Sequence, residues 1–200
     1  MIILNTPSYD FDEEIDLINA FFNKGLDILY IDKPDKNYIQ LIAYISGIDE
    51  IYHNRIIVCQ HHDVAEDFIL KGIHVSSNVR ASLGEDLGIY LGNFVKQSYD
   101  ISVCFDNLQE VKHHGQLPFS YVLIDLKGVQ SHGVDLNEVK GNSFKYIAKG
   151  GISMIGIGLL QQMGFDGVYL SDEIWGSKKP LDMFNSFYTS FLRSFKSTDD

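Results

Sequence analysis

The sequence predicts a (β/α)8 barrel, or TIM barrel, in a single domain. Short apolar segments alternate with helix-sized segments eight times along the 200 residues. The apolar segments show no alternation of polar and apolar residues, which favours parallel strands buried on both faces. Eight such units in 200 residues match the lower size limit of this barrel, and an open doubly wound sheet is the alternative with the same strand count. No linker divides the chain, so residues 1–196 are expected to form the barrel and residues 197–200 a polar tail.

The first four units follow from apolar runs and helical spacing. In the first helix, Phe11, Ile15, Ile18 and Phe22 recur on one face, and Gly25 ends it. The spacing predicts strands at residues 1–4, 28–31, 55–58 and 72–75. It predicts helices from about residue 12, at 37–46, at 64–71 and across 83–97.

The last four units are read in the same way. Strands are expected at residues 101–105, 121–124, 144–148 and 167–170. Helices are expected at 107–113, 152–163 and 181–195, and Pro180 suits the first turn of the last one. A long loop follows residue 124.

Charge and composition exclude several kinds of partner. Sixteen Lys and Arg against 27 Asp and Glu give a net charge of -11, which argues against nucleic acid or an anionic membrane as the main partner. No apolar run approaches the length of a transmembrane helix, and the N-terminus lacks the pattern of a signal peptide. Cys59 and Cys104 have no metal-ligand spacing and are expected to be reduced thiols. The sequence therefore predicts a cytoplasmic protein.

Candidate site residues come from the strand ends, because barrel active sites lie at the C-terminal ends of the strands. Gly150 and Gly151 follow the seventh strand, and a helix is expected to begin at once, so that its N-terminus and the glycine amides can hold a phosphate. Ser171 follows the eighth strand. Lys33 ends the second strand, where it can neutralise a phosphate or pair with Asp32. In QHHD at 60–63 the histidines are adjacent and no spaced third ligand is evident, which argues against a dedicated zinc site.

Four motifs in order resemble those of the thiamine-phosphate synthase and TenI (thiazole tautomerase) superfamily. LYIDKP at 29–34 resembles the second-strand motif LHLRKP, and QHHDVAEDFILKGIHV at 60–75 resembles the segment that ends in GVHL. AKGGI at 148–152 resembles the phosphate turn ALGGI, and MGFDGVYL at 163–170 resembles the closing strand. The likeness spans most of residues 1–175.

This resemblance implies a TIM barrel, usually dimeric, that acts on small phosphorylated substrates. Synthases of the family join hydroxymethylpyrimidine diphosphate to thiazole phosphate with Mg²⁺ assistance and release pyrophosphate. By resemblance, Lys33, His61, Ser131 and His132 become the candidate catalytic residues. Gly150, Gly151 and Ser171 become the candidate phosphate-binding residues.

Several positions depart from the family motifs and leave alternatives open. Asp32 stands where the motif has arginine, His132 stands at a lysine position, and Asp172 and Glu173 follow the last strand, where synthases place small residues and a serine. A TenI-like tautomerase, with His132 or His61 as its base, is one alternative. A catalytically degenerate barrel that binds a phosphorylated metabolite is another.

Overall fold

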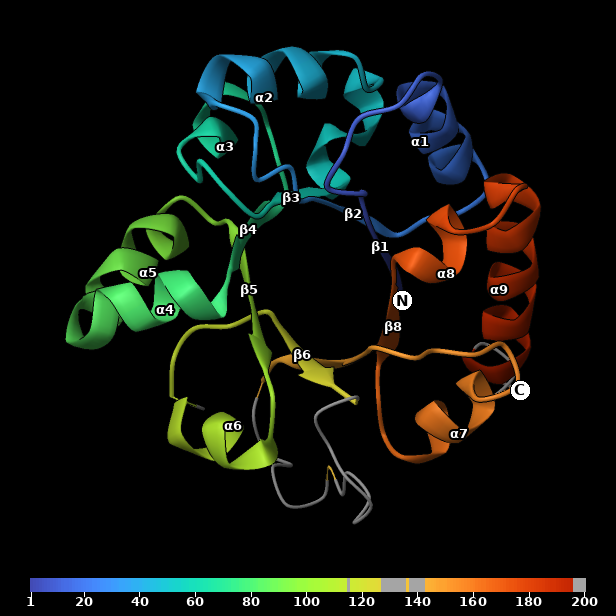
Figure 1. Cartoon of the computed structure of the whole chain (residues 1–200). Helices are drawn as coiled ribbons and strands as arrows, with labels where there is room; N and C mark the ends of the chain where they lie inside the picture. Colours follow the sequence, from blue (N-terminus) through green and yellow to red (C-terminus); the bar gives the residue numbers. More distant parts are fainter. Residues whose placement is uncertain (115, 127–135, 137–142, 196–200) are drawn as a thin grey trace.

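A computed structural model describes residues 1–114, 116–126, 136 and 143–195. Its strands form a closed parallel barrel in sequence order, and β1 and β8 meet to complete the ring (Figure 1). The predicted barrel is thereby confirmed and the open sheet excluded. The strands are β1 (Ile2–Asn5), β2 (Ile28–Ile31), β3 (Ile56–Val58), β4 (Gly72–Val75), β5 (Asp100–Phe105), β6 (Tyr121–Asp125), β7 (Lys145–Lys149) and β8 (Gly167–Leu170).

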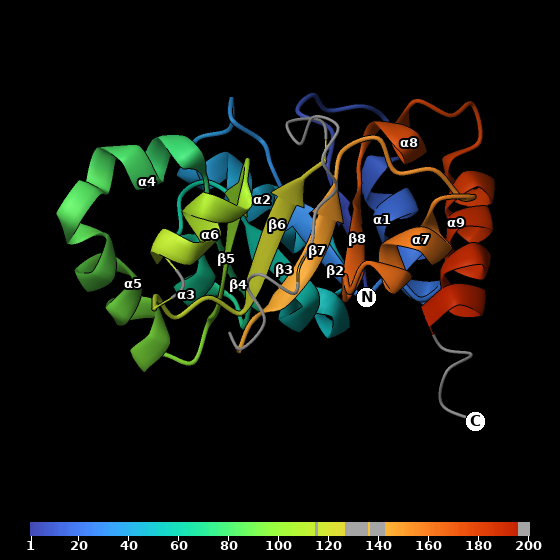
Figure 2. The same ribbon diagram turned by 90° about the horizontal axis from the view of Figure 1, so that it is seen from below.

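Helices surround the barrel, as the side view in Figure 2 shows. They are α1 (Glu14–Asn23), α2 (Tyr38–Ser46), α3 (Val64–Asp67), α4 (Ser77–Leu83), α5 (Leu87–Lys96), α6 (Leu108–His114), α7 (Ile157–Gln162), α8 (Asp172–Trp175) and α9 (Pro180–Phe195). Two short 3-10 turns, η1 (Glu50–Arg55) and η2 (Gly84–Asp86), complete the described elements. Among these helices, none is long and apolar enough to cross a membrane.

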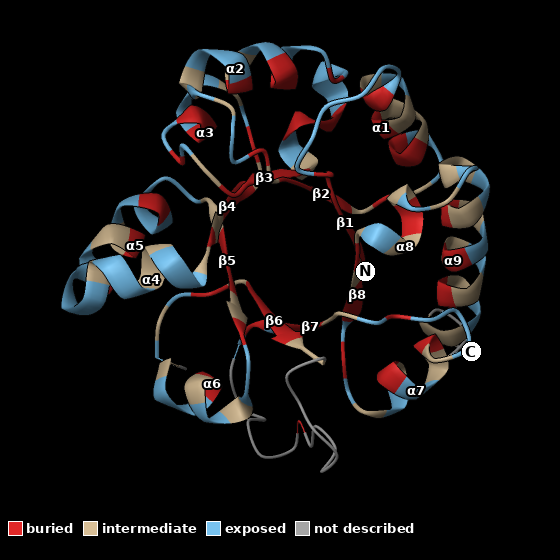
Figure 3. Cartoon of the chain, viewed as in Figure 1, coloured by how far each residue is buried: buried red, intermediate tan, exposed pale blue. Residues whose placement is uncertain are grey.

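Most strands contribute apolar residues to two cores, and for this reason their sequences do not alternate. Along β2, Ile28 and Tyr30 belong to the core inside the barrel, whereas Leu29 and Ile31 pack outward against the helices. Figure 3 shows the strands almost wholly buried. Side chains on the inner face of a strand end therefore line the mouth of the barrel, and those on the outer face lie behind its wall.

Several helical segments differ from the sequence prediction, and one of them, α8, was not expected at all. The expected helix at 64–71 ends early, because α3 covers only Val64–Asp67. An additional helix, α4, begins after Ser76, whose side chain accepts a hydrogen bond from the Val79 N–H as an N-cap. The helix expected from residue 152 begins only at Ile157. A turn precedes it, in which the Ser153 hydroxyl accepts from the Gly156 N–H at 3.2 Å.

Candidate functional site at the barrel mouth

The candidate site lies where the C-terminal ends of the strands meet the following loops. Gly150 and Gly151 follow β7, Ser171 follows β8, and Lys33 and His61 come shortly after β2 and β3. Ser131 and His132 lie outside the described residues, and their catalytic roles stay predictions.

The glycine pair forms a turn that few other residues would adopt. Gly150 has a φ of 85° and Gly151 a φ of 66°, in the left-handed region where a Cβ is strained. Neither glycine N–H donates to an acceptor within the described part of the chain. Because α7 begins only at Ile157, the expected helix N-terminus at this turn is wrong. Two backbone amides, and no helix dipole, are what the turn offers an anion.

The neighbouring strand end already carries an anion of the protein itself. The Ser171 N–H donates to the Glu173 carboxylate (Oε2) at 3.0 Å. The expected phosphate site between β7 and β8 would use this Ser171 N–H together with the glycine amides. In the structure, the Ser171 N–H is already hydrogen-bonded to the Glu173 carboxylate. A bound phosphate at Ser171 would have to displace Glu173 or tolerate its charge.

Lys33 lies behind the barrel wall. Its side chain is 1% exposed, and its Nζ lies 2.8 Å from Glu14 Oε1 and 3.1 Å from Asp10 Oδ1. It also donates to the Tyr9 carbonyl at 2.7 Å, and the Tyr44 hydroxyl donates to Glu14 Oε1 at 2.6 Å. This buried ion pair holds the loop before α1 against the end of β2. The charge of the Lys33 ammonium is thus balanced by carboxylates of the protein, and no phosphate is needed to balance it.

Asp32, on the opposite face of the same strand end, is held by Gln60. The Gln60 side-chain amide donates to Asp32 Oδ1, and Gln60 Oε1 accepts from the Lys33 N–H at 3.1 Å. The expected alternative of a Lys33–Asp32 pair is wrong, since each has other partners.

The two histidines after β3 have different surroundings. His61 is exposed, and its Nε2 lies 3.1 Å from the Lys36 carbonyl. His62 is buried: its Nδ1 lies 2.6 Å from the Tyr90 hydroxyl and its Nε2 2.9 Å from the His74 carbonyl. Burial lowers the pKa of His62, so the neutral ring donates to His74 and accepts from Tyr90. Both histidines line a cleft of about 520 Å³, together with Cys59, Gln60, Ser76, Asn78, Val79 and Tyr90.

Inside the barrel, a chain of polar and aromatic side chains forms the floor of the mouth. His74 Nδ1 lies 2.9 Å from the Ser102 hydroxyl, and the His74 ring lies 5.3 Å from that of Tyr30. Tyr30 in turn meets Tyr169 edge to face at 5.6 Å. Burial, with smaller effects of Lys149 and His62, lowers the pKa of His74 to about 3. His74 is therefore neutral near pH 7.

Lys149 is the residue that reasoning from the sequence missed. Its Nζ lies 3.6 Å from Cys104 Sγ and 5.5 Å from the centre of the Tyr169 ring. It sits at the inner face of β7, directly before Gly150. A lysine immediately before a glycine pair at a strand end was the available signal.

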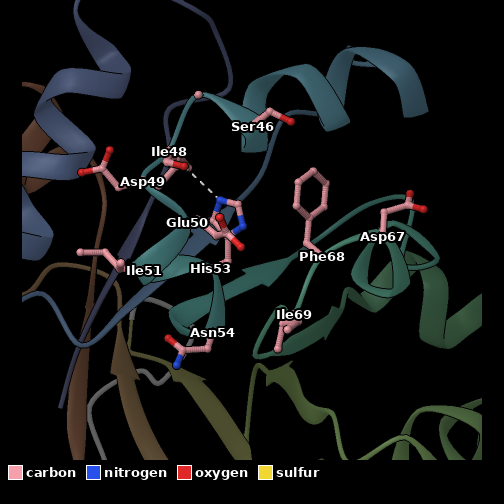
Figure 4. Close-up of a pocket in the computed structure, with 11 residues that line it drawn as sticks. Ser46, Ile48, Asp49, Glu50, Ile51, His53, Asn54, Asp67, Phe68 and Ile69 are labelled. Atoms are coloured by element: carbon pink, nitrogen blue, oxygen red, sulfur yellow. Dashed lines mark hydrogen bonds between the residues drawn. The ribbon is translucent and has the colours of Figure 1, made fainter.

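A second hollow lies on the other end of the barrel. A groove of about 720 Å³ runs between the segment after α2 and the segment after α3 (Figure 4). In it, His53 Nε2 lies 3.0 Å from the Ile48 carbonyl. Its lining comes from the loops that lead into β3 and β4, on the face that serves stability in such barrels. We therefore place the site at the mouth, although this groove is the larger hollow.

The resemblance to synthases implies Mg²⁺, which prefers several oxygen ligands. Across the described ranges, no three His, Cys, Asp or Glu side chains come together to hold a metal ion. The carboxylate of Asp32 accepts a hydrogen bond from the Gln60 side-chain amide. The described residues at the mouth therefore do not fit a Mg²⁺ site.

Comparison with known proteins shows which barrels share this fold. The closed ring of strands and surrounding helices define a (β/α)8 barrel, whose mouth is formed by the loops that follow the strands. A thiamine phosphate pyrophosphorylase from Bacteroides thetaiotaomicron superposes with a TM-score of 0.77 at 23% identity, covering 94% of this chain and 96% of that one. The corresponding protein from Pyrococcus furiosus gives 0.75 at 12% identity, with 96% of each chain covered. A 3-hexulose-6-phosphate synthase gives 0.60 at 14% identity, covering 94% and 98%. No protein-family profile and no curated protein sequence matches the chain.

Proposed function

We propose that this protein is a divergent thiamine-phosphate synthase-like barrel that binds a phosphorylated thiazole at its mouth. The observation that carries the proposal is the Gly150–Gly151 turn at the end of β7, whose two left-handed glycines present amides with no acceptor among the described residues. The shared fold with two thiamine phosphate pyrophosphorylases supports it. The ordered motifs of the sequence add to this support.

The reaction to test first is the union of thiazole phosphate with hydroxymethylpyrimidine diphosphate. A bond forms between the thiazole nitrogen and the pyrimidine methylene carbon, and the carbon–oxygen bond to the diphosphate breaks. The glycine amides would bind the thiazole phosphate and so orient its ring nitrogen. Asp32 would oppose a diphosphate at its end of the mouth, because like charges repel. The described residues thus support the binding of thiazole phosphate better than the binding of hydroxymethylpyrimidine diphosphate.

The test combines binding and turnover. Titration calorimetry with thiazole phosphate measures the affinity, and incubation with both precursors and Mg²⁺ measures the formation of thiamine phosphate. Saturable binding with product supports the synthase. Binding without product at high protein concentration identifies the catalytically degenerate barrel. Absence of thiazole phosphate binding contradicts the whole proposal.

A TenI-like tautomerase is the second candidate, favoured by the position of His61. The exposed imidazole lines the cleft beside the mouth, and only its Nε2 is engaged within the described residues. The other nitrogen, Nδ1, is available to move a proton. His61→Ala and His132→Ala would each abolish isomerisation of a thiazole carboxylate phosphate if that residue is the base, and unchanged isomerisation removes it from the mechanism.

A further inference from the structure

The groove around His53, at the end of the barrel away from the mouth, exposes several large apolar side chains. Ile51 of η1 is 74% exposed, and Ile69, between α3 and β4, is 84% exposed. Both line the groove (Figure 4). In the same groove, the half-buried Phe68 ring meets the His53 ring edge to face, with 5.2 Å between their centres. A single exposed isoleucine is ordinary, but several apolar side chains that share one hollow mark a binding surface.

The charged side chains of this groove are all negative. They are Asp49, Glu50 and Asp67, and no Lys or Arg is among the described residues that line it. All three acidic residues are exposed, and none of them takes part in the ion pairs of the described chain. Asp67 accepts a hydrogen bond from the Tyr38 hydroxyl, which leaves its charge unbalanced.

Helix α2 adds to the negative potential of the groove. The helix ends at Ser46, and both Ser46 and the following Gly47 line the groove. The C-terminus of a helix carries a partial negative charge, which a basic residue in the last turn commonly balances. The last turn of α2 contains no basic residue. This end of the helix therefore favours a cation from outside.

The cations that lie nearest to the groove in the sequence are directed elsewhere. Arg55 Nε donates to the Asp27 carbonyl at 3.1 Å, and the Arg55 guanidinium lies 4.9 Å from the centre of the Phe22 ring. Lys71 Nζ lies 3.0 Å from Asp100 Oδ2. Within the described chain, the groove thus combines an apolar surface with negative charges that no cation of its own lining balances.

We propose that this groove docks a short segment of another protein that carries lysine or arginine next to large apolar side chains. The apolar side chains cover Ile51, Phe68 and Ile69, and the cations approach Glu50 and Asp67. A second copy of this chain fits less well, because its net charge is -11 and like charges repel. The segment leaves the barrel mouth open, so the inference stands apart from the proposed function.

The first experiment compares labelled peptides by fluorescence anisotropy, titrated with the whole protein. One short peptide combines lysine and leucine, a second has serine in place of every leucine, and a third has glutamate in place of every lysine. We expect the first to bind at least about tenfold more tightly than either of the others, and its affinity to fall as salt is added. Equal binding of the first two peptides overturns the inference, because net charge alone would then explain it.

Variants with matched controls test the two halves of the surface. Ile69→Ser should weaken the lysine–leucine peptide about tenfold, and Glu50→Gln about threefold. The control for the first is Ile89→Ser on α5, where Ile89 is 73% exposed. The control for the second is Glu85→Gln, since Glu85 lies in the first turn of η2 as Glu50 does in η1. Both controls should leave the affinity unchanged, and equal weakening by a groove variant and its control overturns the inference.

Two further measurements locate the peptide and identify the occupant. In amide NMR spectra of the whole protein, the peptide should shift the signals of Gly47, Asn54 and Ile69, and not that of Gly151 at the mouth. Shifts of the same size at Gly151 overturn the inference. Sedimentation without peptide tests the second copy: a wild-type dimer that Ile69→Ser converts to a monomer would show that another copy of this chain covers the groove, and overturns the assignment of a basic partner.

Discussion

The two sides of the barrel mouth differ in how far their polar groups are already engaged. On the side of β2 and β3, Asp32 is bonded to Gln60, Lys33 to Glu14, and His62 to Tyr90. On the side of β7, the Gly150 and Gly151 amides have no acceptor among the described residues, and the Lys149 ammonium, which lies in register with Asp125, contacts the Cys104 thiol. A ligand gains most where it does not have to replace an existing hydrogen bond or ion pair.

This difference separates stability from binding. Groups on the β2 side hold loops and helices to the barrel, and changes there should alter the free energy of unfolding. The glycine amides on the β7 side make no such contacts among the described residues, and changes there should alter the affinity for a phosphate.

The largest expected effect is on stability, from Glu14→Gln. The change leaves the buried Lys33 ammonium with Asp10, which is 58% exposed, as its only carboxylate partner in the described part of the chain. Breaking a buried pair by removing one partner costs about 3 kcal/mol or more, so the free energy of unfolding in urea should fall by about this amount. Asp10→Asn, at the exposed end, should cost less than about 1 kcal/mol. Equal losses of stability in the two variants would show that the buried Lys33–Glu14 pair contributes no more to the free energy of unfolding than the exposed Lys33–Asp10 pair.

The next effect is a dependence of stability on pH from His74. Its pKa of about 3 in the folded protein lies below the unfolded value of about 6.5. The unfolded state therefore takes up the proton first as the pH falls. The contribution of neutral His74 to the free energy of unfolding is therefore complete above pH 6.5 and is lost between pH 6.5 and 3. The loss amounts to about 2 kcal/mol at pH 5.

Urea unfolding of the wild type and of His74→Gln at pH 7 and pH 5 measures this contribution. The variant should lose less stability than the wild type over that interval. Identical losses would mean that His74 is not kept neutral by its surroundings.

A smaller effect, on binding, is expected from Gly151→Ala. A Cβ at Gly151 meets no atom within 4 Å, but the positive φ is strained for alanine by about 1 kcal/mol. Relaxation of the turn would move the amides, and calorimetry should show about tenfold weaker binding of thiazole phosphate.

Gly84→Ala is the matched control for this change. Gly84 also has a positive φ, 51°, and open space around its Cβ position, but it lies between α4 and α5. We expect a similar loss of stability with unchanged binding. Weaker binding in both variants to the same extent would trace the effect to stability alone.

The smallest effect is expected from Glu173→Gln. The amide oxygen of glutamine can still accept from the Ser171 N–H, while the charge that opposes a phosphate is removed. The affinity for thiazole phosphate should rise by about threefold to tenfold. Asp172→Asn, at an exposed neighbour, should change it less, and an equal rise in both would indicate only a general effect of net charge.

The barrel could be predicted because the strands are marked by their own apolar residues. All eight predicted strands lie within one residue of those in the structure. Helix starts were harder to place, since Ile152 is buried and suits either a turn or the first turn of a helix. The chain instead turns at Ser153 and Gly156 before α7 begins.

The site was less accessible to sequence reasoning because both faces of a barrel strand are apolar. In LYID at 29–32, nothing in the pattern says which face looks inward, so the outward direction of Lys33 was hidden. The same ambiguity hid the inward direction of Lys149. Its place directly before Gly150 was a signal, but only the register of β7 assigns its face.

The most direct test is a crystal structure of the protein soaked with thiazole phosphate. We predict that the phosphate accepts hydrogen bonds from the Gly150 and Gly151 amides on the β7 side of the mouth. A phosphate bound in the cleft beside Gln60 and His61, or in the groove around His53 at the other end of the barrel, would contradict this.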